Sequence, residues 1–185
     1  MRVIAGEFRR RILSTLEGSN TRPTTDRNKE NIFNVIGPYF DGGTSLDMFG
    51  GSGSLTIESI SRGIEKGVII DKHPKAINII KKNVEMLKIE DRVDIIRGNY
   101  LDVMKTLADQ GKKFDLILID PPFKMLVIDE LVKFIDEFDL LTEDGLIMAE
   151  FFKENKFNAE FNTIECYRFI DYGTSHIQLY RKKEL

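Results

Sequence analysis

The sequence predicts an α/β domain built around a mostly parallel sheet. From Gly43 onward, short runs rich in β-branched residues alternate with helical patterns, which is typical of right-handed βαβ units. Two final strand-like runs, 161–170 and 175–180, are joined by only four residues. Because so short a link cannot hold a crossover helix, we expect these two runs to form an antiparallel pair. The length of 185 residues fits one domain, 1–185, with a full hydrophobic core.

The domain is expected to divide into an N-terminal extension, residues 1–40, and a core, residues 41–185. In the extension, two short strands at 2–5 and 8–13 flank Gly6 and are expected to form a hairpin or a strand pair. A helix follows, with Thr24 or Thr25 as its N-cap and Gly37-Pro38 at its end. The strands expected in the core are 45–49, 67–71, 93–97, 114–120 and 146–151, in addition to the final pair. The helices expected between them are 54–62, 74–87, 100–108 and 126–138.

The composition is that of a soluble globular protein, with 42% hydrophobic and 31% charged residues. No apolar run approaches the ~18 residues that span a membrane, and the Met-Arg-Val-Ile start does not resemble a secretory signal. The single Cys166, expected in the core, excludes an intrachain disulfide and a cysteine-based zinc cluster. We therefore expect a cytoplasmic protein with no membrane partner and no metal.

Charge is distributed unevenly along the chain. Residues 1–29 hold seven basic and three acidic side chains, a net charge of +4, whereas the remainder carries −7. A basic end on an acidic body is a sign of nucleic-acid binding, although a basic arm can also serve solubility alone.

The most informative motif is Asp120-Pro121-Pro122-Phe123, which follows the apolar run 114–119. In open α/β sheets, ligands bind outside the carboxyl ends of the strands. Each proline fixes its own φ and lacks an N–H, so this loop is stiff, rich in acceptors and poor in donors. Together with the aromatic ring of Phe123, it suits a flat substrate that carries an amino group.

A second motif predicts a nucleoside-containing cofactor. Glycines in the stretch 46–54 follow the first core strand and open a helix, where backbone N–H groups favour polar or anionic ligands. A phosphate-loop lysine is absent, and Thr56 stands where a dinucleotide motif has its third glycine. Asp71 ends the next strand about 20 residues later, the place where such folds hold the two ribose hydroxyls.

After the third strand, Asn99 offers an amide oxygen that could accept a hydrogen bond from a purine amino group. The same residue could instead cap the helix that begins at Tyr100, and the sequence leaves both roles open.

In combination, these motifs resemble a class I S-adenosylmethionine-dependent methyltransferase. The Asp-Pro-Pro-Phe element is characteristic of members that methylate exocyclic or amide nitrogens. The segment Thr21-Arg22-Pro23-Thr24-Thr25-Asp26-Arg27, with Ser61-Arg62-Gly63 and Tyr172-Gly173-Thr174, is similar to the bacterial RsmD-like family, which methylates guanine N2 in 16S ribosomal RNA. The resemblance covers essentially the whole chain and implies a Rossmann-like, seven-stranded, mostly parallel sheet with an antiparallel last strand and helices on both faces.

The resemblance also implies roles for individual residues. The catalytic set is Asp120, Pro121, Pro122 and Phe123. The set expected to bind S-adenosylmethionine, and its product S-adenosylhomocysteine, is Asp47, Phe49, Gly50, Gly51, Ser52, Gly53, Asp71, Lys72, Asn99, Tyr100 and Asp120. Candidates for phosphate contacts with RNA are Arg9, Arg10, Arg11, Arg22 and Arg27. The expected partner is ribosomal RNA or the assembled small subunit, and we expect a monomer.

The chain departs from the family pattern at two places. Asn99 stands where the family usually carries Asp, and the loop reads Phe-Gly-Gly-Ser-Gly where members typically have Ala at the first or second glycine. Rival functions remain: methylation of adenine N6 in DNA or RNA or of a protein glutamine amide, a nicotinamide-dependent dehydrogenase, and a non-catalytic RNA-binding module. Asp120 counts against the glutamine enzymes, which usually present Asn there.

Overall fold

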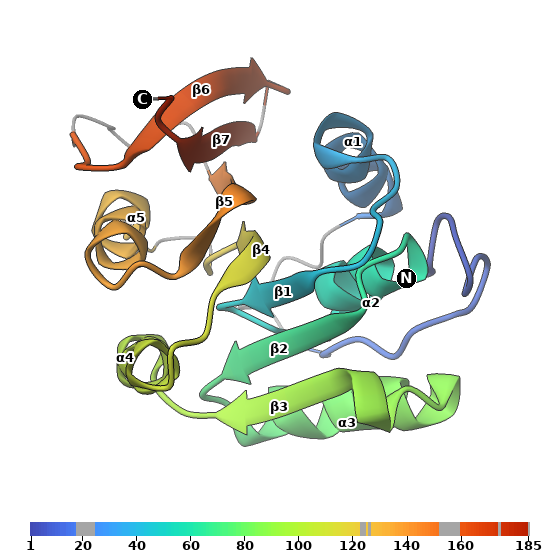
Figure 1. The fold of residues 1–185 in the computed structure, drawn as a ribbon. Helices are drawn as coiled ribbons and strands as arrows, with labels where there is room; N and C mark the ends of the chain where they lie inside the picture. Colours follow the sequence, from blue (N-terminus) through green and yellow to red (C-terminus); the bar gives the residue numbers. More distant parts are fainter. Residues whose placement is uncertain (18–24, 123–124, 126, 152–159, 174, 185) are drawn as a thin grey trace.

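A computed structural model describes residues 1–17, 25–122, 125, 127–151, 160–173 and 175–184. Its centre is one seven-stranded sheet with the strand order β3-β2-β1-β4-β5-β7-β6 (Figure 1). The strands are β1 Thr44–Asp47, β2 Lys66–Asp71, β3 Val93–Arg97, β4 Phe114–Ile119, β5 Leu141–Phe151, β6 Ile164–Asp171 and β7 His176–Lys182. All pairings are parallel except those of β7, which is antiparallel to both β5 and β6. The predicted sheet with a reversed last strand is confirmed.

Helices cover both faces of this sheet (Figure 1). They are α1 Asp26–Ile36, α2 Ser54–Ser61, α3 Pro74–Leu87, α4 Tyr100–Asp109 and α5 Ile128–Glu137, with a short 3₁₀ turn at Glu90–Arg92. One buried cluster lies between the sheet and α4 and α5, and a second joins the sheet to α1, α2 and α3. No helix in the described part of the chain is long and apolar enough to cross a membrane.

The central strand β4 shows why the sheet is buried on both sides. Ile117 and Ile119 contribute to the cluster under α4 and α5, whereas Leu116 and Leu118 contribute to the opposite cluster. All four side chains are at most 1% exposed. Successive strand residues point to opposite faces, so a continuous apolar run is what a strand covered on both faces requires.

The N-terminal residues form a hairpin with less strand pairing than expected. One antiparallel bridge joins Arg2 and Ile12, in place of two regular strands. The reason is that the hairpin bonds to α2: Glu7 N donates to Ser61 O at 2.8 Å, and Gly6 lies so close that a Cβ there would be 1.8 Å from the same oxygen.

Three details of the prediction are settled by local chemistry. Thr25 is the N-cap of α1, and its hydroxyl accepts a hydrogen bond from Asn28 N at 3.1 Å. Gly37 is the C-cap, as expected. The expectation that Cys166 lies in the core is wrong: it is exposed, because β6 is the edge strand of the sheet.

Candidate active site

Three carboxylates meet at the carboxyl edge of the sheet. Asp47 ends β1, Asp71 ends β2 and Asp120 directly follows β4. Because β1 pairs with both β2 and β4, these residues lie on three adjacent strands. The negative charges of Asp120 and Asp71 both contribute to the raised pKa of Asp47, so each of the two interacts electrostatically with Asp47.

The glycine loop, residues 50–53, connects β1 to α2 in a compact turn. Gly50 N donates to Ile70 O at 2.9 Å, and Gly53 N donates to Gly50 O at 2.7 Å. Gly51 and Gly53 have φ angles of +57° and +79°, the left-handed region that glycine adopts without cost. A Cβ at Gly51 would meet nothing within 4 Å, so the loop backbone presents an open surface at this point.

Asp71 holds the loop and keeps acceptor capacity for a ligand. Its Oδ2 accepts from Gly51 N at 2.9 Å, and its Oδ1 accepts from His73 N at 2.9 Å. A carboxylate has about four lone-pair sites, so two hydroxyl groups can still donate to it. The open backbone at Gly51 and the partly filled carboxylate of Asp71 fit a ribose-bearing cofactor, with the exposed side chain of Lys72 beside them.

Asp47 is a buried carboxyl group beneath the loop, 1% exposed. It accepts from Thr56 Oγ1 at 3.1 Å and from Phe49 N at 3.2 Å, so it fixes the start of the loop from below. Burial raises its pKa to about 7, and the two hydrogen bonds only partly oppose this rise. Its place is that of a support for the loop, with the other two carboxylates nearer the surface.

Asn99 makes the helix-cap hydrogen bond that the sequence offered as one of its two roles. Its Oδ1 accepts from Leu101 N at 2.9 Å, at the start of α4. The adjacent Tyr100 ring packs against Phe49, with ring centroids 5.1 Å apart and planes at 56°. Through this contact the start of α4 borders the glycine loop. A contact between Asn99 and the adenine stays a prediction.

The loop that carries the predicted catalytic residues is described as far as Pro122. Asp120 and Pro121 are partly buried and Pro122 is exposed. Met125 N donates to Pro122 O at 3.0 Å. Phe123, the aromatic member of the predicted set, lies outside the described residues.

The described candidates for RNA contacts lie on two elements, the N-terminal hairpin and α1. Arg9, Arg10 and Arg11 are exposed near the hairpin turn, which bonds to Ser61 at the last residue of α2. The glycine loop is at the other end of that helix, roughly 10 Å away along its axis. Arg27 is exposed on the first turn of α1, and Arg22 lies outside the described residues.

Three fully buried polar side chains that the sequence analysis did not single out are Lys29, Glu58 and Asn83, and Lys29 and Asn83 bond to residues at the start of α2 and in the glycine loop. Lys29 precedes Ile32 and Phe33 at helical spacing, and Asn83 stands among the apolar positions 80, 84 and 87. A polar residue inside an apolar helical stripe was therefore the available signal.

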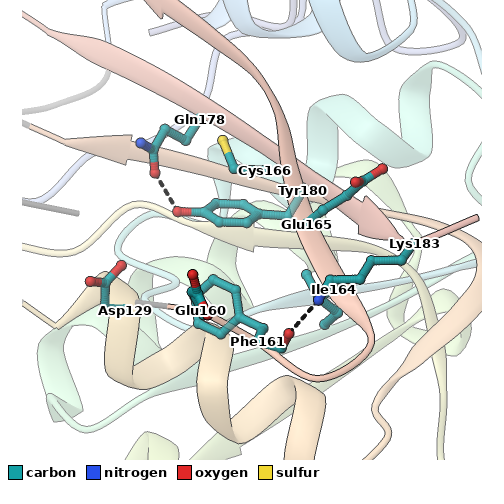
Figure 2. A pocket seen from close by; sticks show the side chains of 9 residues that line it. All are labelled: Asp129, Glu160, Phe161, Ile164, Glu165, Cys166, Gln178, Tyr180 and Lys183. Carbon is teal, nitrogen blue, oxygen red and sulfur yellow. Dashed lines mark hydrogen bonds between the residues drawn. The ribbon is translucent and has the colours of Figure 1, made fainter. Parts of the chain in front are cut away.

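Away from the carboxyl edge, a hollow of ≈ 460 Å³ lies between the start of α5 and strands β6 and β7 (Figure 2). Tyr180 and Gln178 form a hydrogen-bonded pair on its wall, and burial raises the pKa of Tyr180. None of the predicted catalytic or cofactor residues lines it. Among the described residues, no group of three His, Cys, Asp or Glu side chains is placed to hold a metal ion.

Comparison with known proteins assigns the chain to a family. The family model described as "Conserved hypothetical protein 95" matches residues 1–181. The "Putative rRNA methyltransferase YlbH" of Bacillus subtilis (strain 168) is 39% identical over 183 residues, 99% of this chain and 100% of that protein. The "Ribosomal RNA small subunit methyltransferase D" of Haemophilus influenzae is 35% identical over 151 residues, 81% of this chain and 78% of that protein.

Among solved structures, the "Putative methyltransferase yhhF from Escherichia coli" has a TM-score of 0.84 and 28% identity, and the match covers 100% of this chain and 99% of that one. The predicted Rossmann-like methyltransferase fold, the enzyme class and the resemblance to RsmD-like proteins are confirmed. The chain belongs to the family described as Conserved hypothetical protein 95, whose members here include methyltransferases named for small-subunit ribosomal RNA.

Proposed function

We propose that this protein transfers a methyl group from S-adenosylmethionine to the exocyclic N2 amino group of a guanine in 16S ribosomal RNA. The proposal rests on one arrangement: the Asp120-Pro121-Pro122 loop follows β4, and the glycine loop follows β1, its hydrogen-bonded neighbour. A donor held by the glycine loop and a base held by the proline loop would lie side by side. The relationship to methyltransferases named for ribosomal RNA supports ribosomal RNA as the substrate.

The residues that would hold the cofactor are those at the ends of β1, β2 and β3. Asp71 would accept the ribose hydroxyls, and the N–H groups at the start of α2 would face the polar amino-acid part. Phe49 and Tyr100, packed against each other, would border the adenine. When bound, S-adenosylmethionine supplies an electrophilic methyl group on a positively charged sulfur.

The protein's own part in the reaction is to orient a weak nucleophile. The lone pair of guanine N2 is delocalised into the ring, so the amine attacks poorly until its N–H bonds are fixed. Acceptors on both N–H bonds, here Asp120 and the Pro121 carbonyl, would turn the lone pair toward the methyl group. The carboxylate would also stabilise positive charge that develops on N2. After transfer, the N2 proton leaves to Asp120 or to water.

Positioning of the amine against the methyl donor is proposed to supply most of the remaining rate acceleration. Alignment of two reactants at ~3–3.5 Å can contribute on the order of 7–11 kcal/mol to lowering the barrier. A stiff proline loop at the end of a strand buried on both faces suits this task, because neither the loop nor its support has many alternative conformations. The target base must leave its stack to enter the loop, and Phe123 is the proposed stacking partner.

The alternatives are methylation of adenine N6 in DNA or RNA, or of a protein glutamine amide. Both would use the same acceptor loop, so the modified atom has to be identified directly. The test incubates the protein and S-adenosylmethionine with small subunits from cells that lack it, followed by mass mapping of the RNA and of subunit proteins. N2-methylguanosine at one position is expected, whereas N6-methyladenosine or methylated glutamine would overturn the assignment.

A further inference from the structure

Asn83 is a fully buried amide on α3 for which the proposed reaction gives no role. Its Nδ2 donates to Ser14 O and to Ser52 O, both at 2.9 Å. Its Oδ1 accepts from Ser14 N at 2.8 Å. Ser52 belongs to the glycine loop and Ser14 to the N-terminal segment, so one side chain joins the two.

Lys29 of α1 makes a second connection between the N-terminal segment and the start of α2. Its Nζ donates to Ser54 Oγ at 3.0 Å and to Arg2 O at 2.5 Å. Ser54 is the first residue of α2, directly after Gly53. The N-terminal region therefore holds the glycine loop on both sides of Gly53, through a backbone carbonyl at Ser52 and a side chain at Ser54.

These anchors hold Ser52 and Ser54, beside the loop positions that Ile70 O and Asp71 fix through Gly50 N and Gly51 N. Two residues of the loop are in the left-handed region, and Gly53 caps α2 without a side-chain hydrogen bond. Glycine-rich backbone has many accessible conformations, so each fixed carbonyl removes alternatives. Loss of the Asn83 amide would leave the Ser14 groups and Ser52 O without this partner, and a buried polar group left unpaired is costly.

We infer that Asn83 is a positioning residue for cofactor binding, and that the N-terminal segment is thereby a structural part of the cofactor site as well as a candidate RNA surface. This inference rests on the proposed function, because it presumes that the glycine loop binds S-adenosylmethionine. It differs from that function in a measurable way, since it concerns affinity for the cofactor in the absence of RNA.

The test measures the affinity of the full-length protein for S-adenosylhomocysteine by calorimetry, without RNA. For Asn83→Leu, which keeps the branching and the number of side-chain heavy atoms and removes the amide, we expect affinity to fall about 10-fold or more. Lys29→Met, which leaves the loop backbone untouched, should weaken binding less. Amide exchange at Gly51 and Gly53 should accelerate in Asn83→Leu relative to amides in the middle of α3.

Ser61→Ala is the matched control. The Ser61 hydroxyl donates to Ala5 O at 2.6 Å and accepts from Phe8 N at 2.9 Å, so its removal loosens the same N-terminal segment without touching the loop. Cofactor affinity should stay within about twofold of wild type. Equal loss of affinity in Ser61→Ala at equal loss of thermal stability would overturn the inference.

Two further outcomes separate the inference from the proposed function. If wild-type protein does not bind S-adenosylhomocysteine, the proposed function fails and the inference falls with it. If wild type binds and Asn83→Leu binds equally well, only the inference fails. Should Asn83→Leu not fold, Asn83→Ser, which leaves room for water to bridge the same groups, takes its place with the same expected direction.

Discussion

Asp120 carries the chemical part of the proposal at the scale of single residues. Because it is proposed to orient the amine and stabilise charge, Asp120→Ala should lower kcat by about 10²–10³-fold. Affinity for S-adenosylhomocysteine should change little, since Asp71 and the glycine loop are proposed to make the main cofactor contacts. Single-turnover methylation and calorimetric titration measure the two effects separately. Asp109→Ala, at the end of α4, is the control. Near-normal methylation by Asp120→Ala would contradict the proposed mechanism.

Asp47 makes a prediction about pH. Its pKa is about 7 in the folded protein and 3.8 in the unfolded chain, so between these values the folded state binds one proton more. Stability from this group is therefore complete below about pH 4 and is lost as pH rises toward 7, at ~1.4 kcal/mol per pH unit. Asp47→Asn cannot ionise and should lack this slope.

Urea unfolding of both proteins at pH 5 and pH 7 tests this. From pH 5 to pH 7, the free energy of unfolding of Asp47→Asn should rise by about 2–3 kcal/mol relative to that of wild type. Groups that do not interact with Asp47 titrate alike in the two proteins, so the difference reports Asp47 together with its coupling to Asp71 and Asp120. Parallel pH profiles would show that the buried carboxyl is ionised throughout.

The sequence predicts residues whose role depends on local context, and misses those that depend on distant partners. Asp71 and the glycine loop could be assigned because a strand end and a helix start are visible in the pattern. Asn83 could not, because its partner Ser14 is 69 positions away along the chain. Asn99 shows an intermediate case: both of its local roles were visible, and only the structure shows which hydrogen bond forms.

At the scale of elements, the packing of the glycine loop on β2 explains a departure from the family pattern. A Cβ at Gly50 would lie 2.3 Å from Ile69 Cγ2 and 3.0 Å from Ile80 Cδ1. The β-branch of Ile69 thus fills the space that an alanine would take. Gly50→Ala should destabilise the fold by about 1–3 kcal/mol through overpacking.

Ile69→Leu, which lacks the branch at Cβ, should relieve this clash. In a double-mutant cycle, Gly50→Ala combined with Ile69→Leu should cost less than the sum of the two single changes, by about 1 kcal/mol or more. Thermal or urea unfolding supplies the four free energies. Additive values would show that another contact excludes alanine from the loop.

The N-terminal hairpin is the element whose role in RNA binding is most open to test. Arg10 and Arg11 are exposed and lie at the far end of α2 from the glycine loop. Arg10→Glu with Arg11→Glu should weaken binding to 16S RNA and reduce the slope of log affinity against log salt by roughly 1–2 units. Cofactor affinity should not change.

Lys105→Glu, an exposed position on α4, serves as the control for a change in charge alone. An unchanged salt slope in the double reversal would remove the hairpin from the RNA surface. The hairpin turn and the Asp120-Pro121-Pro122 loop lie apart, so a substrate that contacts both must extend along one side of the domain. A folded RNA or an assembled ribosomal particle is large enough to do so.

The order of the elements was predictable to within a few residues, and the tertiary role of the extension was not. Alternating patterns gave each strand and helix of the core, because periodicity reports which faces are buried. The expected N-terminal hairpin is present, but it has one bridge in place of two regular strands, since its backbone groups bond to Ser61 and Glu58 on α2. Those partners are more than 50 positions away along the chain.

At the scale of the whole molecule, a buried charge network joins the extension to the core. Glu58 accepts from Ile4 N at 2.8 Å, and its carboxylate lies 3.9 Å from Lys29 Nζ and 3.8 Å from Arg62 Nε. Burial raises the pKa of Glu58 and lowers that of Lys29, while their mutual attraction opposes both shifts. The Arg62 guanidinium also lies over the Phe33 ring of α1, 5.0 Å from its centroid.

This network predicts that residues 1–185 unfold as one cooperative unit. Glu58→Ala would leave two buried cations without their carboxylate, and loss of one partner of a buried ion pair typically costs about 3–5 kcal/mol. Glu137→Ala, which breaks the exposed pair with Lys133, should cost less than about 0.5 kcal/mol. Native-state amide exchange at Val3 and Leu13 of the hairpin, compared with Ile117 of β4, distinguishes a cooperative domain from a loosely attached arm. In a cooperative domain, Glu58→Ala lowers the opening free energy of both sets together; if only the hairpin amides respond, the extension is an independent unit.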